Sequence, residues 1–288
     1  AIQCFLSGIK QAKQEIRKFN PDVVLGVGGY ITAPVIYAAK KLGYKTFIHE
    51  QNCIPGLSNK FLSHYADRIG VSLEESLAYF DTKKAIFTGN PRSEEVLQVK
   101  PVDKKELGLS PLKKLVLIVM GSLGSMTMNQ KMKEIIPGFA SKNYEVLLVT
   151  GKNYYEKYQK ELAVPSNVKL VPYLDNMLEI MKKTDLIVSR SGASTIAEIT
   201  AIGLPSILVP SPYVTHNHQL KNALALEKCE AAVILEEDNF NKENLMTQID
   251  RILNDQKYYH KMKHSAKKLG VPDSATRIYH VIKELVKE

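Results

Sequence analysis

The chain has 288 residues, 44% of them hydrophobic and 24% charged, which is ordinary for a soluble globular protein of one large or two smaller domains. No apolar run reaches the roughly 18 residues of a membrane-spanning helix, and the first residues, AIQCFLSGIKQAK, lack the pattern of a secretory signal. Cys4, Cys53 and Cys229 are far apart and odd in number, which argues against a disulfide framework and for a reducing cytoplasm.

The formal net charge of +9 favours anionic partners such as phosphate groups or anionic lipid. The sequence has no pattern of a zinc finger, an RRM or a basic leucine zipper, so we expect no nucleic-acid partner. His216 and His218 are too close together for an ordinary zinc site without further ligands, and there is no CxxC pair. We therefore expect no structural metal and no cofactor.

Strands and helices alternate along the first third of the chain. An amphipathic helix is predicted from about Ile2 to Lys18, and Asn20-Pro21 ends it. PDVVLGVGG predicts a buried strand with a glycine turn, ITAPVIYAAKKLG a helix, and TFIHEQN the next strand. PGLSNKFLSHYA then predicts a helix, and DRIGVS and AIFTGNP predict two more strands. This βαβ rhythm indicates a mostly parallel sheet with right-handed crossovers.

The composition changes between residues 92 and 112, where a polar, proline-containing segment predicts a linker with a short helix. A second α/β series follows, with strands in KLVLIVMG, YEVLLVTG, VKLVPYL, DLIVS and AAVILEE. We therefore predict an α/β protein of two Rossmann-like domains with parallel sheets facing an interdomain cleft. The predicted domains are 1–91 and 113–270, joined by the linker at 92–112.

The segment from Asp185 to Pro210 predicts a strand, a small-residue turn, a helix and a second strand. The start of such a helix exposes backbone N–H groups and a partial positive charge, which suit a phosphate. Glu198, in the first turns, can accept hydrogen bonds from the vicinal hydroxyls of a ribose, and the two features together indicate a nucleotide or nucleotide-sugar. The alternative is a capping box, Thr195-Ile-Ala-Glu198, in which Glu198 only closes the helix N-terminus.

Glycine-rich turns end three of the predicted strands, at residues 26–29, 121–125 and 191–194. Each alone is weak evidence, because none is a full GxGxxG fingerprint or a Walker A loop. Together they lie at the carboxyl ends of strands, where open α/β sheets hold ligands. We expect at least one of them, in part the first, to serve as a tight packing turn instead.

Polar side chains gather at His49-Glu50-Gln51-Asn52, the end of an apolar strand. The motif is not HExxH, because position 53 is Cys, so metalloprotease chemistry has no support. Asn52 offers the donor and acceptor that suit a sugar hydroxyl, and so do Gln219 and Asn222, three residues apart on one helix face. The alternative for each amide is a cap or turn contact.

The motifs GVGGY, HEQN, PGLSNK, GNPR, GSLGS, RSGASTIAE, GLPSILVP and QLKNA occur in this order over nearly the whole chain. They closely resemble those of the MurG family, inverting glycosyltransferases of the two-domain GT-B fold. That family transfers GlcNAc from UDP-GlcNAc to undecaprenyl-pyrophosphoryl-MurNAc-pentapeptide, converting lipid I into lipid II in peptidoglycan synthesis, without a bound metal. The resemblance implies UDP-GlcNAc, lipid I and the anionic membrane surface as partners. It also implies a peripheral location on the cytoplasmic face of the bacterial cell membrane.

The same resemblance implies that the donor lies mainly on the C-terminal domain. Ser122 would meet the diphosphate, Leu174 would offer its backbone to uracil, and Glu198 would hold the ribose. Asn52 and Gln219 would hold the GlcNAc hydroxyls, with Asn222 beside them, and Arg92 would lie on the phosphate side. The start of the donor helix would comprise Ala193, Ser194, Thr195, Ile196, Ala197 and Glu198.

The chain departs from the family pattern at its start. Family members begin with a strand and a GGTGGH-like loop, whose His is a candidate base, and this motif does not occur in the sequence. We therefore expect donor binding with little or no transfer, and exposed strand edges in an N-terminal sheet that lacks its first strands. His49 and Glu50 are the remaining candidates for the base. The last helix, 271–288, is expected to return to the N-terminal domain.

The first helix also predicts peripheral membrane association. Apolar residues recur there at helical spacing beside basic ones, namely Ile2, Phe5, Leu6 and Ile9 with Lys10, Lys13, Arg17 and Lys18. The alternative is that this apolar stripe packs on the N-terminal sheet. Two alternatives for the function also stay open: another GT-B transferase that uses a UDP-sugar and a lipid acceptor, or a non-catalytic UDP-sugar-binding subunit completed by a partner chain.

Overall fold

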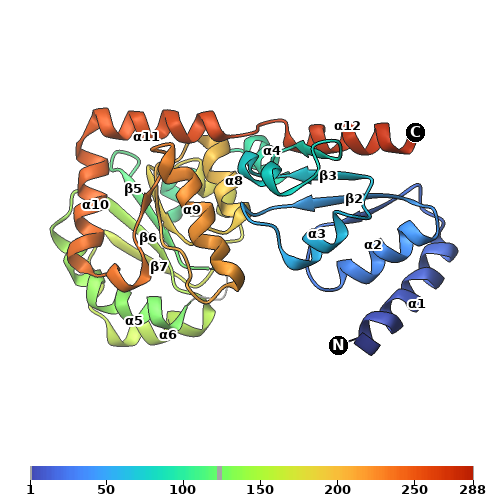
Figure 1. The fold of residues 1–288 in the computed structure, drawn as a ribbon. Helices are drawn as coiled ribbons and strands as arrows, with labels where there is room; N and C mark the ends of the chain where they lie inside the picture. Colours follow the sequence, from blue (N-terminus) through green and yellow to red (C-terminus); the bar gives the residue numbers. More distant parts are fainter. Residues whose placement is uncertain (1, 122–124, 288) are drawn as a thin grey trace. The chain divides into compact units, whose positions relative to one another are not determined.

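Figure 1 shows the computed structural model of the chain, which describes residues 2–121 and 125–287. Contacts divide the chain into two compact units. The N-terminal unit comprises Ala1–Glu94 and Val271–Glu288, and the C-terminal unit comprises Glu95–Gly270. Each unit is built on a parallel sheet of its own, as the alternation of strands and helices predicted.

A four-stranded parallel sheet forms the centre of the N-terminal unit, with the strand order β1-β2-β3-β4. Its strands are short, largely apolar runs, which suit a sheet covered on both faces. They are β1 Val23–Gly26, β2 Lys45–Glu50, β3 Arg68–Val71 and β4 Ala85–Phe87. Because strands that follow one another in the chain are parallel neighbours, each connection crosses over the sheet.

Helices pack on both faces of this sheet. Phe47 and Ile48 are successive residues of β2, so their side chains point to opposite faces. Phe47 packs with residues of the last helix, and Ile48 packs with Ile36 and Leu62. The end of the chain therefore contributes to the core of the N-terminal unit. The helices of this unit are α1 Ile2–Phe19, α2 Thr32–Lys41, α3 Leu57–Leu62 and α12 Ser274–Lys287, with a 3-10 turn at Glu74–Tyr79.

A six-stranded parallel sheet forms the centre of the C-terminal unit, with the order β10-β9-β8-β5-β6-β7. The chain builds outward from β5 in one direction through β6 and β7, and then in the other through β8, β9 and β10. The strand order therefore reverses between β5 and β8. The strands are β5 Leu115–Val119, β6 Glu145–Val149, β7 Val168–Val171, β8 Leu186–Ser189, β9 Ser206–Leu208 and β10 Val233–Ile234.

Helices surround this second sheet (Figure 1). They are α5 Met126–Ile135, α6 Lys152–Glu161, α7 Met177–Met181, α8 Ala193–Ile202, α9 His218–Lys228, α10 Lys242–Asn254 and α11 Gln256–Leu269. Short 3-10 turns lie at Lys104–Leu107, Ile136–Ser141, Thr215–Asn217 and Glu237–Asn239. The predicted linker at 92–112 holds α4 Arg92–Gln98 and the first of these turns, and no strand. Within residues 2–121 and 125–287, no helix is long and apolar enough to cross a membrane.

Candidate functional site

Two of the glycine-rich loops leave neighbouring strands of the C-terminal sheet. The last residues of β5 and β8, Val119 and Ser189, are paired with each other. Each strand is followed by a short loop and then by a helix, α5 or α8. Because parallel strands end at the same edge, both loops meet where the strand order reverses, the position at which open α/β sheets bind ligands. Ser122 lies outside the described residues, so its contact with a diphosphate stays a prediction.

The helix α8 begins with backbone donors that have no partner inside the helix. Its N-cap is Gly192, in an extended conformation (φ −67°, ψ 146°), and no side chain caps it. The first internal bond runs from Ile196 N to Gly192 O at 3.0 Å. The N–H groups of Ala193, Ser194 and Thr195 therefore remain for an external acceptor, which suits a phosphate in the partial positive field of the helix start.

The capping-box alternative for Glu198 is wrong. It requires Thr195 at the N-cap, whereas Gly192 occupies that position and Thr195 lies inside the helix. Glu198 lies almost one turn beyond Thr195 along α8, and it is only 7% exposed. A buried carboxylate beside a phosphate-type helix start is compatible with a ribose acceptor, and that role is carried forward as a proposal.

The helix α9 holds the loop that precedes α8. The Ser191 hydroxyl donates to the Gln219 carbonyl at 2.8 Å, and Asn222 Nδ2 donates to the Ser191 carbonyl at 3.2 Å. Asn222 is fully buried, so it positions this loop. Gln219 is only partly buried, and its Oε1 accepts from Ser211 N at 2.8 Å. The structure thus places the Asn222 amide and the Gln219 backbone carbonyl at the loop before α8, whereas the partly buried Gln219 amide contacts the segment after β9.

An ion pair that the sequence did not reveal lies behind these loops. Arg190 Nη2 is 2.8 Å from Glu237 Oε2, with both side chains largely buried. Arg190 Nη1 also donates to the Val209 carbonyl at 3.1 Å, and Nη2 to Ser125 Oγ at 3.5 Å. One side chain therefore connects the N-cap of α5, the end of β9 and the segment before α10. The only signal in the sequence was the position of Arg190 directly before Ser191-Gly192.

Leu174 lies in the loop that follows β7, at the same carboxyl edge as the two glycine loops but two strands away from β5. Its side chain is buried, while that of Tyr173 beside it is 46% exposed. The ammonium of Lys152 lies 5.7 Å from the centre of the Tyr173 ring. The buried Leu174 fixes the path of this loop, and contact of its backbone with a base stays a prediction.

In the N-terminal unit, Glu50 organises the loop after β2. Its Oε1 accepts from Asn52 N at 2.9 Å and from Asn52 Nδ2 at 3.3 Å. Its Oε2 accepts from Gly56 N at 3.1 Å and from Asn59 Nδ2 at 2.8 Å. The carboxylate is therefore used to hold the loop that carries the partly buried Asn52. A carboxylate committed in this way is a positioning group and is poorly placed to accept a proton from a substrate.

His49 is buried behind this loop. Its Nε2 lies 3.0 Å from the Gly89 carbonyl and 3.2 Å from Thr88 Oγ1. Burial lowers its pKa below the ordinary 6.5, against smaller raising effects of the Gly89 carbonyl and the Glu50 charge. The imidazole is therefore neutral near pH 7, with the Nε2 proton donated to Gly89. Arg92 lies elsewhere in this unit, at the start of α4, where its N–H donates to Asn90 Oδ1 at 3.1 Å.

Over residues 2–121 and 125–287, no group of three or more His, Cys, Asp or Glu side chains could hold a metal ion. The C-terminal unit instead offers a phosphate-type helix start, a buried carboxylate six residues after its N-cap and a partly buried amide on α9. The fold and these features define a class, the α/β enzymes of two parallel-sheet units that use nucleotide-sugars.

Family models cover most of the chain. Residues 115–278 match the glycosyltransferase family 28 C-terminal domain, and residues 1–71 match the glycosyltransferase family 28 N-terminal domain. The chain belongs to glycosyltransferase family 28, and it is a glycosyltransferase.

Individual proteins agree with this. The UDP-N-acetylglucosamine–N-acetylmuramyl-(pentapeptide) pyrophosphoryl-undecaprenol N-acetylglucosamine transferase 1 of Bacillus cereus is 47% identical over 291 residues, covering 100% of this chain and 80% of that protein. The crystal structure of Acinetobacter baumannii MurG has a TM-score of 0.79 at 24% identity, covering 100% of this chain and 81% of that one. The UDP-GlcNAc 2-epimerase of Neisseria meningitidis, bound to UDP-GlcNAc, has a TM-score of 0.74 at 14% identity, covering 97% of this chain and 81% of that one. The predicted GT-B fold is confirmed.

Proposed function

We propose that this glycosyltransferase transfers N-acetylglucosamine, with inversion, from UDP-GlcNAc to undecaprenyl-pyrophosphoryl-MurNAc-pentapeptide. The reaction class is that of the Bacillus cereus relative, whose name states this transfer. The observation that carries the proposal is the pairing of β5 with β8, which brings two glycine-rich loops and the uncapped start of α8 to one edge of the sheet.

In this proposal, different residues of the C-terminal unit bind different parts of the donor. The first N–H groups of α8 bind the diphosphate and stabilise the charge that develops on UDP as the glycosidic bond breaks. Glu198 accepts from the ribose hydroxyls, and Gln219 contacts the GlcNAc hydroxyls. Asn222 and Arg190 hold the surrounding loops in place through the contacts described above.

The acceptor hydroxyl needs a base, since positioned proton transfer typically contributes about 10²–10⁴-fold to the rate. Neither of the two candidates is well placed for this role. His49 Nε2 is turned to the Gly89 carbonyl, and both Glu50 oxygens accept from the loop that follows β2. We therefore assign Glu50 to positioning the loop that carries Asn52, and His49 to holding the segment Thr88–Gly89 that follows β4.

The experiment that tests the function measures binding and transfer separately. Calorimetry with UDP-GlcNAc and UDP-glucose should show a preference for UDP-GlcNAc. Mass spectrometry after incubation with a soluble lipid I analogue should detect little disaccharide-linked product, because neither His49 nor Glu50 is placed to act as the base. Preferential binding and turnover of UDP-glucose would favour another UDP-sugar:lipid transferase. Binding of UDP-GlcNAc without transfer, restored by a second polypeptide, would favour the subunit alternative.

We also propose that the N-terminal unit associates peripherally with an anionic membrane surface. Part of the apolar stripe of α1 packs inside the unit. Ile9 packs against a buried cluster that Ala12 and Ile16, further along α1, form with Ala38 and Ala39 of α2. The ring of Phe5 lies 6.2 Å from that of Phe61 on α3. Packing inside the unit thus explains the buried side chains of α1, but it does not explain the exposed ones.

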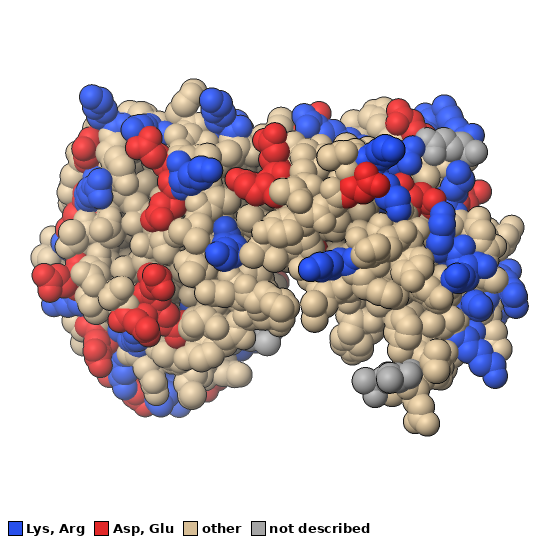
Figure 2. All heavy atoms as spheres, in the orientation of Figure 1, with Lys and Arg blue, Asp and Glu red and all other residues tan. Residues whose placement is uncertain are grey.

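Exposed apolar side chains remain on α1 and α3. Leu6 is 59% exposed, Leu57 68% and Phe61 40%. Figure 2 shows Lys and Arg side chains gathered over the part of the N-terminal unit that includes α1. Lys10 and Lys60 are both exposed on these two helices. Exposed apolar side chains on the same two helices as exposed basic ones support insertion at the headgroup level of an anionic leaflet.

Vesicle sedimentation tests this membrane proposal. Leu6→Asp and Leu57→Asp should each weaken binding to phosphatidylglycerol vesicles, because each replaces an inserted apolar group by a charge of the wrong sign. Tyr279→Asp, at an exposed position on α12 of the same unit, is the control and should bind like the parent chain. Equal binding by all three variants would contradict the proposal. Phe5→Asp and Ile9→Asp are poor tests, since both side chains are packed inside the unit.

A further inference from the structure

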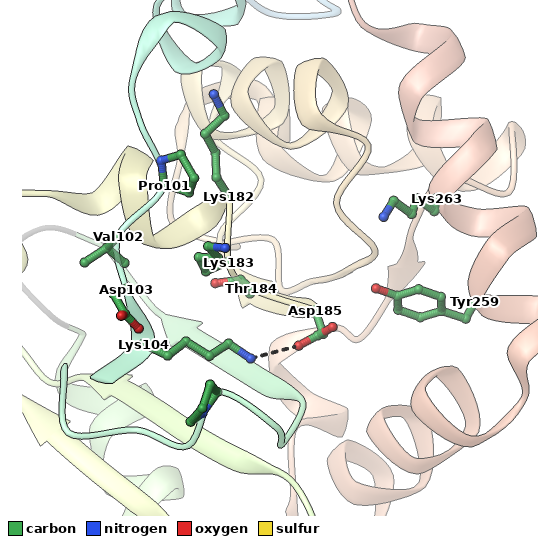
Figure 3. Close-up of a pocket in the computed structure, with 11 residues that line it drawn as sticks. Pro101, Val102, Asp103, Lys104, Lys182, Lys183, Thr184, Asp185, Tyr259 and Lys263 are labelled. Carbon is green, nitrogen blue, oxygen red and sulfur yellow. Dashed lines mark ion pairs between the residues drawn. The ribbon is translucent and has the colours of Figure 1, made fainter. Parts of the chain in front are cut away.

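The C-terminal unit contains a polar cavity at the edge of the sheet where its strands begin. The cavity has a volume of about 560 Å³ and is lined by residues 101–104, residues 182–185 and α11 (Figure 3). Asp185, in its lining, directly precedes β8, whose other end leads to the α8 loop. The four residues of β8 span about 13 Å. This cavity is therefore separate from the candidate donor site.

The wall of the cavity is fixed by hydrogen bonds. Val102 N donates to the Glu179 carbonyl at 3.3 Å, which ties residues 101–104 to α7. Lys182 Nζ donates to the carbonyls of Leu97 and Val99 at 2.9 and 2.7 Å. Lys104 Nζ donates to the Lys113 carbonyl at 2.8 Å. The cavity is therefore formed before any ligand arrives, which lowers the entropic cost of binding.

Positive charge exceeds negative charge in this lining. It includes four lysines and two aspartates, namely Lys104, Lys182, Lys183, Lys263, Asp103 and Asp185. The aspartates are engaged locally: Asp103 Oδ1 accepts from Lys105 N at 3.0 Å, and Asp185 Oδ2 accepts from Leu115 N at 2.8 Å and lies 3.6 Å from Lys104 Nζ. Within the described part of the chain, no residue pairs with the ammonium groups of Lys183 and Lys263.

Tyr259 adds a neutral donor to the same wall. Figure 3 shows its hydroxyl directed from α11 toward the cavity, on the side of Lys263. Burial, and secondly the Asp185 charge, raise its pKa to about 12, so the hydroxyl keeps its proton near pH 7. Among the described residues this hydroxyl has no hydrogen-bond acceptor. Two ammonium groups on exposed side chains and one largely buried hydroxyl thus have no protein acceptor around one space in the described part of the chain.

An adjoining cavity of about 290 Å³ extends the same basic region. It shares Lys182, Thr184, Tyr259 and Lys263 with the first, and adds Lys267. The pKa of Lys267 is lowered by burial first and by the Lys182 charge second. The described residues that line this adjoining cavity include three lysines and no Asp or Glu, so a bound anion would relieve the repulsion between their charges.

We propose that this cavity binds a small phosphate-bearing anion through Lys183, Lys263 and the Tyr259 hydroxyl. The volume lies within the range of small-ligand sites, about 300–1,000 Å³. A phosphate is a multivalent acceptor that can take several of these donors at once, whereas a monovalent anion would leave most of them unsatisfied. The shared chemistry admits two sources: a free phosphate compound or the headgroup of an anionic phospholipid.

Calorimetry on the 288-residue chain tests the proposal. Inorganic pyrophosphate is titrated in the presence of saturating UDP, which keeps the donor site occupied. The double variant Lys183→Gln/Lys263→Gln should lose about tenfold or more in pyrophosphate affinity, and Tyr259→Phe several-fold. The matched control, Lys257→Gln/Lys268→Gln, removes two charges from exposed positions of α11 outside the cavity and should change affinity less than about twofold. UDP affinity should stay the same in every variant, which also reports an intact fold.

A second experiment distinguishes a free phosphate compound from a phospholipid headgroup as the ligand. Vesicles of phosphatidylglycerol are sedimented with the same variants. Loss of pyrophosphate binding in the cavity variant alone supports a free phosphate ligand, and loss of vesicle binding in that variant alone supports a headgroup. The proposed site is overturned if both double variants weaken the binding of pyrophosphate and of vesicles equally. It is also overturned if neither measurement distinguishes the cavity variant from its control.

Discussion

At the residue scale, hydrogen bonds identify buried polar side chains that hold the loops of the two units. Glu50 and Asn222 are both polar and buried, and their hydrogen bonds go to neighbouring loop segments. Glu198 instead lies on a helix whose first N–H groups are left for an external acceptor. The ribose-binding role of Glu198 stays a proposal, and it rests on the position of this residue along α8.

Replacing Glu198 should weaken donor binding. Glu198→Ala removes the acceptor proposed for the ribose hydroxyls, and loss of hydrogen bonds to a charged group costs about 1.5–3 kcal/mol, or roughly ten- to a hundredfold in UDP affinity. Calorimetry with UDP measures it. Glu243→Ala, at an exposed position in the first turn of α10, is the control and should leave the affinity unchanged. If Glu198→Ala binds UDP as tightly as the parent chain, the Glu198 carboxylate does not contact the donor.

His49 should make the N-terminal unit less stable at acidic pH. Its folded pKa is lowered from the ordinary 6.5, so the unfolded chain takes up a proton first as the pH falls. The stability that neutral His49 contributes is therefore complete above about pH 6.5 and is lost as the pH drops toward the folded pKa, with a limiting slope of about 1.4 kcal/mol per pH unit.

His49→Gln tests this dependence. The variant should lose less stability than the parent chain between pH 7.5 and 5.5, measured by urea-dependent hydrogen exchange of peptides from β2. His64→Gln, at an exposed position of the same unit, should follow the parent chain. Identical pH profiles for parent and His49→Gln would show that this imidazole does not titrate as its burial implies.

At the scale of elements, the close approach of α11 to α8 fixes the helix at whose start we propose the donor site. A Cβ added to Gly270, at the end of α11, would lie 2.6 Å from the Thr200 carbonyl oxygen and 3.0 Å from Ala201 Cα. Both are backbone atoms of α8, so they cannot move aside without shifting the helix. The backbone of Gly270 itself is an ordinary extended one (φ −71°, ψ 142°).

Gly270→Ala should therefore destabilise the C-terminal unit through contact alone, by about 1–3 kcal/mol. Gly56→Ala is a matched control, because Gly56 has nearly the same backbone (φ −65°, ψ 154°) and a Cβ there would meet no atom within 4 Å. Calorimetric melting of both variants measures the difference. Equal melting temperatures would mean that α11 adjusts freely against α8.

At the scale of the whole molecule, each unit has a core of its own. Val96 and Leu109, within the predicted linker, are buried. Ser110 N donates to Glu145 Oε2 at 2.8 Å, and Lys182 Nζ caps the carbonyls of Leu97 and Val99. These contacts lie inside the C-terminal unit, which the contact pattern begins at Glu95.

A fragment of residues 95–270 should therefore fold alone and bind UDP within about threefold of the 288-residue chain. A fragment that begins at residue 113 should be markedly less stable, since it loses buried apolar residues worth about 1.5–3 kcal/mol each. Circular dichroism melts and UDP calorimetry on both fragments provide the comparison. Failure of the 95–270 fragment to bind UDP, although folded, would mean that the N-terminal unit supplies an essential donor contact.

The sequence by itself determined the α/β class, the approximate place of each strand, the glycine-rich loops and the family. These features depend on local periodicity, on turn residues and on ordered motifs, all of which can be followed along the chain. It also suggested the phosphate-type start of α8. It did not determine which residue caps that helix, because Gly192 and Thr195 both lie in a turn of small residues that allows either start.

Only the tertiary structure decided which of these segments meet. The pairing of β5 with β8 depends on crossovers that bury both faces of the sheet, and no local pattern encodes it. The Arg190–Glu237 pair joins residues 47 positions apart (237 − 190), and the basic cavity joins residues 101–104, 182–185 and 259–263. Such groupings form because burial forces distant polar groups to find partners, and that requirement arises only once the sheets and helices have packed.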